Sequence, residues 1–155
     1  MDEVVRLLRV NNKYVSCMES CTGGAVSNAI TNIEGASEVF KYGAVTYSNE
    51  YKIKMGVDPL VIDKFSVYSM ETAHSMSRAI SDFSLSNYGI GITGKINRMD
   101  VNNLYGEDNV VFISIYDRDM DKYYDKIIRV DSLNRSDNKL FIVDGIIQML
   151  MEILR

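Results

Sequence analysis

Apolar residues recur along this chain with two different periods, and each period predicts a different kind of element. Apolar side chains at three- and four-residue steps indicate amphipathic helices, whereas short apolar runs between polar residues indicate strands. The helical pattern covers residues 3–10, about 22–32, 49–55, a segment beginning at Asp58-Pro59, a longer segment capped by Ser69, and a last segment from Val143 to Leu154. The strand pattern covers residues 14–18, 40–47, 88–93, 110–116 and 123–130. Residues 95–108 are polar and predict a loop.

The order of these elements predicts the fold class. Strands alternate with helices up to residue 93, which is typical of parallel βα units. The acidic stretch Asp117 to Asp121 then joins two strands that we expect to form a hairpin. Together these features predict one α/β domain over residues 1–155, with three α/β/α layers around a mixed β-sheet.

Composition narrows the class of protein. The chain has 155 residues, of which 46% are hydrophobic and 25% are charged, as in ordinary soluble domains. The net charge of −4 gives no electrostatic basis for binding nucleic acid or an anionic membrane. No apolar run approaches the roughly 20 residues of a membrane span. The N-terminal residues lack the basic start and the small-residue cleavage site of a signal peptide, so we expect a cytoplasmic protein.

The chain has few side chains that bind soft metals. Cys17 and Cys21 are its two cysteines and His74 is its one histidine, which is too few for a structural zinc site. A disulfide between the two cysteines is not expected in a reducing cytosol. We expect Cys17 to be a small buried residue.

The segment Glu19-Ser20-Cys21-Thr22-Gly23-Gly24 is the leading candidate for chemistry, because it lies where a predicted strand turns into a helix. Backbone N–H groups point out of such a turn and favour negative charge. A nucleophile placed there, such as Ser20, therefore has an oxyanion hole beside it. The alternative is that Ser20 or Thr22 caps the following helix, as serine and threonine commonly do.

A serine nucleophile needs a base, and Lys52 is the best-placed candidate. His74 lies on a predicted helix, far from any motif, so we expect it at the surface or at the edge of the core. Lys52 follows the strand 40–47, and Ser20 follows the strand 14–18. If those strands are parallel, both residues meet at one edge of the sheet, within hydrogen-bond reach. The alternative for Lys52 is a solvated surface lysine.

Three nearby residues each allow a functional and a structural interpretation. Tyr47 could donate to an oxyanion, or it could be a core aromatic at the end of a strand. Asn49 could hold an amide, or it could cap the next helix. Cys21 could be a thiol nucleophile whose pKa falls at a helix N-terminus, but we rank it below Ser20.

The glycines of Gly89-Ile90-Gly91-Ile92-Thr93-Gly94 have the spacing of a dinucleotide-binding loop. The match is weak, because no helix is predicted to begin after Gly94.

These motifs together resemble the CinA C-terminal domain family, which includes nicotinamide mononucleotide deamidases. The resemblance rests on the Glu-Ser-Cys-Thr-Gly-Gly segment, on Gly35 to Phe40, on Gly43 to Lys52 followed by Gly56-Val57, and on Gly91 to Gly94. It covers most of the chain and weakens after residue 94. The family's fold, as the resemblance implies it, agrees with three α/β/α layers.

The resemblance also implies roles for particular residues. Ser20 would attack the carboxamide carbon, and Lys52 would take and return the proton. The oxyanion and amide would be held by Tyr47, Asn49, Thr93, Gly94 and the backbone amides of Cys21, Thr22 and Gly23. Arg135, with Arg98 or Lys95, would hold the phosphate. Lys139 stands where a second arginine is common in the family.

The sequence departs from the family after Gly94. Lys95 to Asp100 replaces a glycine-rich stretch whose backbone amides approach the ligand. Lys95 and Arg98 could hold a phosphate with their side chains instead. They could equally be ordinary loop charges in a site that has lost activity. The stretch from Lys52 to Gly56 is also one residue shorter than is usual in the family.

Two functions follow from these observations. The first is an amidohydrolase of pyridine nucleotide salvage that acts on a small nucleotide and needs neither cofactor nor metal. The second is a catalytically degenerate relative that binds nucleotides or serves as a structural domain. Both functions are compatible with a homo-oligomer.

Overall fold

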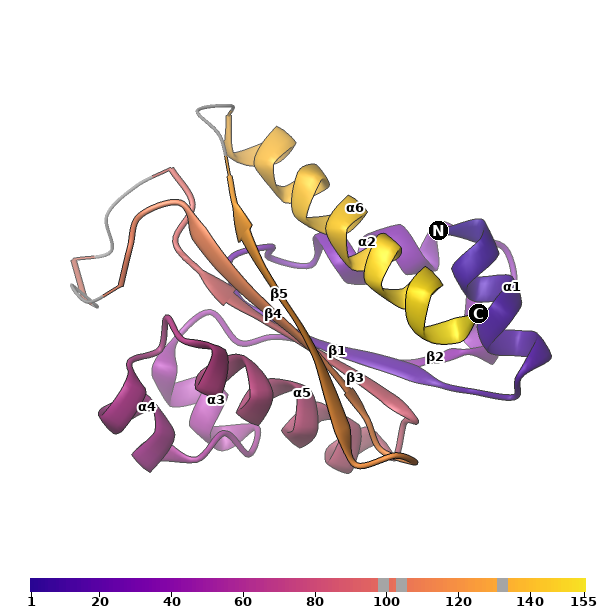
Figure 1. The fold of residues 1–155 in the computed structure, drawn as a ribbon, viewed down its shortest axis with the longest axis horizontal. Coiled ribbons are helices and arrows are strands. Elements are labelled where there is room, and N and C mark those ends of the chain that lie inside the picture. Colours follow the sequence, from indigo (N-terminus) through magenta and orange to yellow (C-terminus); the bar gives the residue numbers. More distant parts are fainter. Residues whose placement is uncertain (98–100, 103–105, 131–133) are drawn as a thin grey trace.

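A mixed five-stranded β-sheet forms the centre of the molecule (Figure 1). The computed structural model describes residues 1–97, 101–102, 106–130 and 134–155. The strand order is β2-β1-β3-β4-β5, and the strands are β1 (Val15–Glu19), β2 (Phe40–Val45), β3 (Tyr88–Gly94), β4 (Val110–Asp117) and β5 (Lys122–Arg129). β1 is parallel to β2 and β3, whereas β4 is antiparallel to β3 and β5. The predicted mixed sheet and its late hairpin are therefore confirmed.

Helices cover both faces of this sheet, which confirms the predicted three layers (Figure 1). One face carries α1 (Asp2–Val10), α2 (Ala25–Thr31) and α6 (Arg135–Leu154). The other face carries α3 (Asn49–Lys54), α4 (Pro59–Phe65) and α5 (Met70–Ser84). A short 3-10 helix, η1 (Ala36–Glu38), precedes β2.

The two faces of β3 pack differently. Ile90 and Ile92 point into a large apolar cluster shared with α1, α2 and α6. Gly89 and Gly91 lie under α5 instead, and a Cβ added at Gly89 would stand 2.0 Å from the carbonyl oxygen of Ser77. These glycines therefore let α5 approach the sheet closely. This close approach explains their presence without a dinucleotide, and β3 leads into β4 rather than into a helix.

Helices α4 and α5 begin at the residues that their sequences predict. The side chain of Asp58 accepts a hydrogen bond from the N–H of Leu60, and Pro59 is the first residue of α4. The side chain of Ser69 accepts from the N–H of Thr72 at the start of α5. Both helices thus begin where a local cap satisfies one of their free N–H groups.

Several predicted boundaries differ from the structure. The largest difference is at α6, which begins at Arg135 rather than at Val143. Two further differences lie next to the candidate site. The helix predicted from about residue 22 begins at Ala25, because Gly23 and Gly24 have φ angles of 60° and 100° that end the turn before it. The strand predicted to reach Tyr47 ends at Val45.

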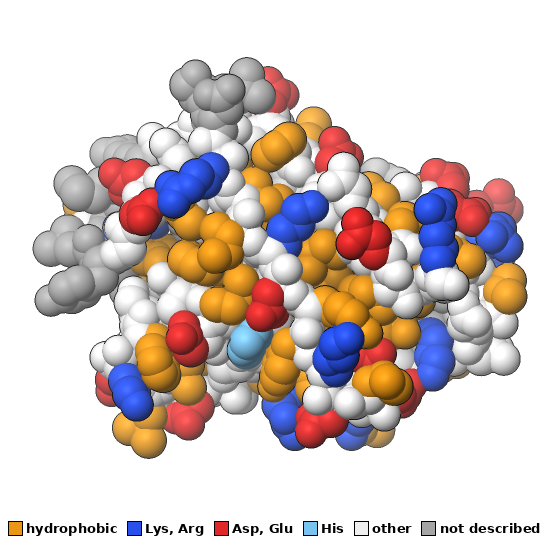
Figure 2. All heavy atoms as spheres, viewed as in Figure 1, with side chains coloured by type: hydrophobic (Ala, Val, Ile, Leu, Met, Phe, Trp, Pro, Cys, Tyr) orange, Lys and Arg blue, Asp and Glu red, His pale blue; other side chains and the backbone are white. Residues whose placement is uncertain are grey.

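Charged side chains of both signs are interspersed over the face shown in Figure 2, with no large patch of either sign. Within the described residues, no helix combines the length and the apolar character that crossing a membrane requires.

Candidate active site

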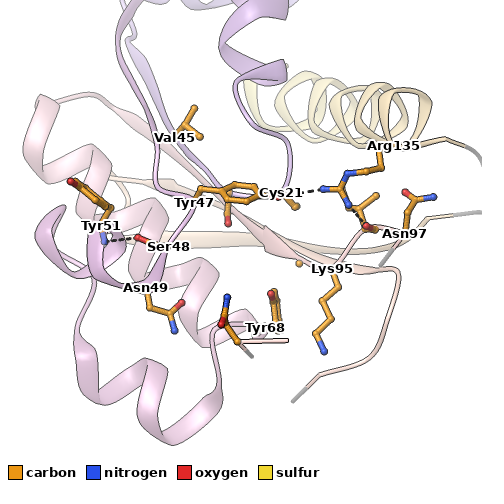
Figure 3. A pocket seen from close by; sticks show the side chains of 14 residues that line it. Cys21, Val45, Tyr47, Ser48, Asn49, Tyr51, Tyr68, Lys95, Asn97 and Arg135 are labelled. Carbon is orange, nitrogen blue, oxygen red and sulfur yellow. Dashed lines mark hydrogen bonds between the residues drawn. The ribbon is translucent and has the colours of Figure 1, made fainter. Parts of the chain in front are cut away.

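A cavity of about 1080 Å³ opens beside the carboxyl ends of β1, β2 and β3 (Figure 3). Such a volume is at the upper end of typical small-molecule sites. Its lining includes the predicted site residues Ser20, Cys21, Tyr47, Asn49, Gly94, Lys95 and Arg135. The cavity is also lined by Val45, Ser48 and Tyr51, which lie in the Gly43 to Lys52 segment of the resemblance, and by Tyr68, Ile96, Asn97 and Asn102, to which the sequence assigns no role.

Ser20 and Lys52 lie within hydrogen-bond distance of each other, as their placement in the sequence predicts. Lys52 Nζ is 3.1 Å from Ser20 Oγ. Ser20 follows β1 directly, and its N–H donates to the carbonyl of Ile92 on the neighbouring β3. Lys52 comes from α3, which follows β2 on the other side of β1. The parallel strands thus bring together two residues that are 32 positions apart.

Lys52 is buried, so the alternative of a solvated surface lysine is wrong. Only 2% of the residue is exposed, and its Nζ also donates to the carbonyl of Thr46 at 2.7 Å. Lys52 is the buried residue of α3, and Ser48 caps that helix by accepting from the N–H of Tyr51. Asn49 is therefore not the cap, and its place in the cavity lining fits a contact with a ligand.

The structure separates the two candidate nucleophiles. Ser20 lies against the amine of Lys52, whereas burial raises the pKa of the Cys21 thiol to about 12. A backbone hydrogen bond at Cys21 and the nearby charges of Lys52 and Arg135 lower that pKa, but burial outweighs them. The expected fall in the pKa of Cys21 is therefore wrong. At neutral pH Cys21 is a protonated thiol, which is a poor nucleophile.

The cap of α2 is Glu19, which the sequence analysis did not single out. Gly24 occupies the N-cap position without a side-chain bond, and neither Ser20 nor Thr22 caps the helix. The fully buried Glu19 carboxylate accepts instead from the N–H groups of Gly24, Val26 and Ser27. The local signal for this role is the position of Glu19 at the end of β1, directly before the turn into α2.

The backbone amides after Ser20 are only partly available to a ligand. The N–H of Gly23 donates to the carbonyl of Ser20 at 3.0 Å, so the expectation that it faces an oxyanion is wrong. This bond leaves the N–H of Cys21 as the backbone candidate, because Cys21 lines the cavity whereas Thr22 is buried. The turn is tight at Gly23, where a Cβ would approach Lys139 Nζ to 3.1 Å.

Tyr47 and Arg135 form one wall of the cavity (Figure 3). Tyr47 is 67% exposed, so it is not a core aromatic. Arg135 is the first residue of α6, and its guanidinium donates to the hydroxyl of Tyr47 at 3.4 Å and to the carbonyl of Ile96. These bonds hold a cationic planar group at the cavity, as a phosphate contact requires.

Lys95 lies in the cavity lining, but its charge is directed at its own loop. Its Nζ donates to the carbonyl of Gly106 at 3.2 Å and lies 3.9 Å from the carboxylate of Asp108 and 5.0 Å from the centre of the Tyr68 ring. Only 3% of the residue is exposed. Figure 3 shows the amine pointing away from Arg135. Lys95 is therefore better placed to hold the loop than to bind a phosphate beside Arg135.

Three other candidates do not reach the cavity in the described part of the chain. The hydroxyl of Thr93 donates to the carbonyl of Val67 at 2.8 Å, so it is engaged inside the protein. Thr22 is buried, and its hydroxyl has no hydrogen-bond partner among the described residues. His74 pairs with Asp125 at 2.8 Å, at the partly exposed junction of α5 and β5, as its expected surface position implies. Arg98 lies outside the described residues.

The family model of the CinA C-terminal domain matches residues 1–150. The chain belongs to the CinA C-terminal domain family. This assignment agrees with the resemblance of its motifs and extends it over almost the whole chain.

Relatives in sequence carry names that refer to competence and damage. A competence-damage inducible protein of Alkaliphilus oremlandii is 41% identical over 96 residues, and one of Clostridium perfringens is 46% identical over 96 residues. Each match covers 61% of this chain and 23% of the relative. This CinA-family chain thus matches less than a quarter of the length of these curated relatives.

Solved structures of CinA proteins have the same fold. The competence/damage inducible protein CihA of Agrobacterium tumefaciens is 26% identical, with a TM-score of 0.86 over 99% of this chain and 95% of that chain. A CinA superfamily protein of Klebsiella pneumoniae has a TM-score of 0.90 at 21% identity, over 99% of this chain and 94% of that chain, and supports the fold alone.

Proposed function

We propose that this CinA-family domain is an amidohydrolase that converts nicotinamide mononucleotide to nicotinate mononucleotide and ammonia. The observation that carries the proposal is the contact of 3.1 Å between Lys52 Nζ and Ser20 Oγ, at the wall of a large cavity. A serine hydroxyl becomes a nucleophile only when a neighbouring base takes its proton, and a buried amine can act as that base. The proposal includes a place in the cytoplasm, in the salvage of pyridine nucleotides.

The proposed reaction has two steps. Ser20 Oγ attacks the carboxamide carbon while its proton passes to Lys52, and the proton then passes to the leaving ammonia as the C–N bond breaks. Water next attacks the acyl-enzyme, with Lys52 taking its proton and returning it to Ser20. Burial supports this cycle because it disfavours the charged form of an amine.

Substrate binding would use Arg135, Tyr47 and the backbone beside Ser20. Arg135 would hold the phosphate, since a guanidinium presents a planar set of donors to phosphate oxygens. The N–H of Cys21 would stabilise the oxyanion. Tyr47 would hold the amide or a phosphate oxygen, because its hydroxyl lies at the cavity beside Arg135.

One observation favours a second function. Lys95 stands where the family has a ligand-facing glycine stretch, and its amine is bound to Gly106 within its own loop. A loop held in this way could leave a nucleotide-binding domain without turnover. The two functions differ in whether bound nucleotide loses ammonia.

The deciding experiment is ammonia release from nicotinamide mononucleotide by the purified protein, with the nucleotide product identified by mass spectrometry. Nicotinamide riboside and free nicotinamide serve as substrates that lack the phosphate, and the Ser20→Ala protein serves as the blank. We expect ammonia and nicotinate mononucleotide in equal amounts. Saturable nucleotide binding without ammonia would support the degenerate relative. Neither binding nor ammonia at millimolar nucleotide would overturn both functions.

A further inference from the structure

Glu19 has an unusual environment for a carboxylate beside a candidate nucleophile. Glu19 is fully buried, and both oxygens of its carboxylate accept hydrogen bonds. Oε2 accepts from the N–H groups of Gly24 and Val26 at 3.0 and 3.1 Å. Oε1 accepts from the N–H and the hydroxyl of Ser27, both at 2.8 Å, and from the thiol of Cys17 at 3.5 Å. Both carboxylate oxygens therefore have their hydrogen-bond donors within the protein.

The same residue is also tied to the strand that delivers the base. The carbonyl of Glu19 accepts from the N–H of Thr46 at 2.8 Å, and the carbonyl of Thr46 accepts from Lys52 Nζ at 2.7 Å. The side chain of Glu19 thus binds the start of α2. Its main-chain carbonyl binds Thr46, whose own carbonyl holds the amine of Lys52. Ser20 is the next residue in the chain, between these two attachments.

We infer that Glu19 is a positioning residue, which holds the turn from Ser20 to Gly24 so that Ser20 Oγ faces Lys52 and the N–H of Cys21 faces the reacting carbonyl. The inference rests on Ser20 as the nucleophile of the proposed function. By occupying the amides of Gly24, Val26 and Ser27, the carboxylate also keeps them from binding a substrate anion. The oxyanion hole is thereby confined to the turn itself.

The test uses a probe that reports the reactivity of Ser20 without depending on the natural substrate. With a fluorophosphonate, Ser20 Oγ bonds to phosphorus, the P–F bond breaks, fluoride leaves, and Lys52 takes up the hydroxyl proton. We expect Glu19→Gln to slow this labelling by about 10- to 100-fold, because a small misplacement of a reacting group has a large effect on rate. The amide nitrogen of glutamine would face N–H donors that need an acceptor. Glu19→Asp keeps both oxygens and should recover part of the rate.

Asp58→Ala is the matched control, since it removes a carboxylate cap from α4, outside the cavity lining. It should leave the labelling rate unchanged while it lowers thermal stability. Should Glu19→Gln fail to fold, Ser27→Ala removes one donor from Oε1 and should still slow the labelling by about two- to threefold. For nicotinamide mononucleotide, Glu19→Gln should lower kcat and leave KM nearly unchanged.

Labelling of folded Glu19→Gln at the wild-type rate would overturn the inference, as would a wild-type protein that is not labelled at Ser20. Equal slowing by Asp58→Ala would also overturn it, because the effect would then be one of general stability. A wild-type protein that is labelled at Ser20 but releases no ammonia would refute the proposed function and leave the role of Glu19 standing.

Discussion

The amine of Lys52 lies 2.7 Å from the carbonyl oxygen of Thr46, which anchors it on the side away from solvent. Lys52 Nζ also donates to Ser20 Oγ, 3.1 Å away. In the proposed reaction, a deprotonated Lys52 amine would accept the proton of this hydroxyl. The main chain after β2 therefore sets the direction of the proposed base as well as its position.

Replacing Lys52 by arginine tests whether proton transfer or only positive charge is needed. A guanidinium stays protonated in proteins, so Lys52→Arg cannot act as a base. We expect Lys52→Arg and Lys52→Ala to lower kcat by on the order of 10³-fold. Single-turnover assays across a range of pH would measure the loss. Retention of activity in Lys52→Arg would show that Lys52 serves only as a cation.

Ser20 and Cys21 form a matched pair for identifying the nucleophile. Ser20→Ala should lower turnover by on the order of 10³-fold or more while the fold is kept. Cys21→Ala should keep kcat close to the wild-type value, because the thiol is protonated at neutral pH. Circular dichroism would confirm that both variants are folded. The reverse pattern, with Ser20→Ala active and Cys21→Ala inactive, would transfer the role to the thiol.

Arg135 should contribute to binding rather than to the chemical step. Charge-assisted hydrogen bonds to a phosphate are worth about 1.5–3 kcal/mol, so Arg135→Ala should raise KM for the mononucleotide by about 10- to 100-fold. It should change kcat much less, because a phosphate contact is present in ground and transition states alike. The rise in KM should be absent with nicotinamide riboside, which has no phosphate. Arg129→Ala on β5 is the control, since Arg129 pairs with Glu107 outside the cavity lining.

Lys95→Met removes the charge of a buried side chain and keeps most of its length. The carbonyl of Gly106 would lose a donor, so the free energy of unfolding should fall by about 1–3 kcal/mol. Urea unfolding measures this change. KM should rise less than in Arg135→Ala, because Lys95 Nζ points into its loop. An equal rise in KM, with unchanged stability, would instead assign Lys95 to the phosphate.

The two buried thiols predict a loss of stability in alkaline solution. Burial raises the pKa of Cys17 and, to about 12, that of Cys21, from an ordinary value of 9.0. Above pH 9 the unfolded chain therefore binds fewer protons than the folded chain, and the free energy of unfolding falls as pH rises. The slope should approach about 1.4 kcal/mol per pH unit for each thiol.

Urea unfolding between about pH 8 and pH 10 measures this dependence. The double variant Cys17→Ala/Cys21→Ala should show a much flatter curve, because its thiols are gone. Burial also raises the pKa of Tyr88 to about 12, which affects stability only above the ordinary tyrosine value of 10.0. A wild-type curve as flat as that of the variant would contradict the buried thiols.

Local patterns in the sequence determined the elements of this protein and the place of its candidate chemistry. The apolar run before Ser20, the helix start at Asp58-Pro59 and the cap at Ser69 depend on neighbouring residues, so they can be inferred without knowing the fold. The pairing of Ser20 with Lys52 also followed from the sequence, because parallel strands deliver their carboxyl ends to the same edge of a sheet.

The tertiary structure alone decided what surrounds those residues. The raised pKa of Cys21 comes from burial, which outweighs the backbone hydrogen bond at Cys21 and the nearby charges of Lys52 and Arg135. The role of Glu19 depends on which way its side chain turns, and the direction of Lys95 depends on Gly106 and Asp108 closing the loop around it. The spacing of apolar residues along a chain indicates its helices and strands. Burial and hydrogen-bond partners are instead set by contacts between segments that only folding brings together.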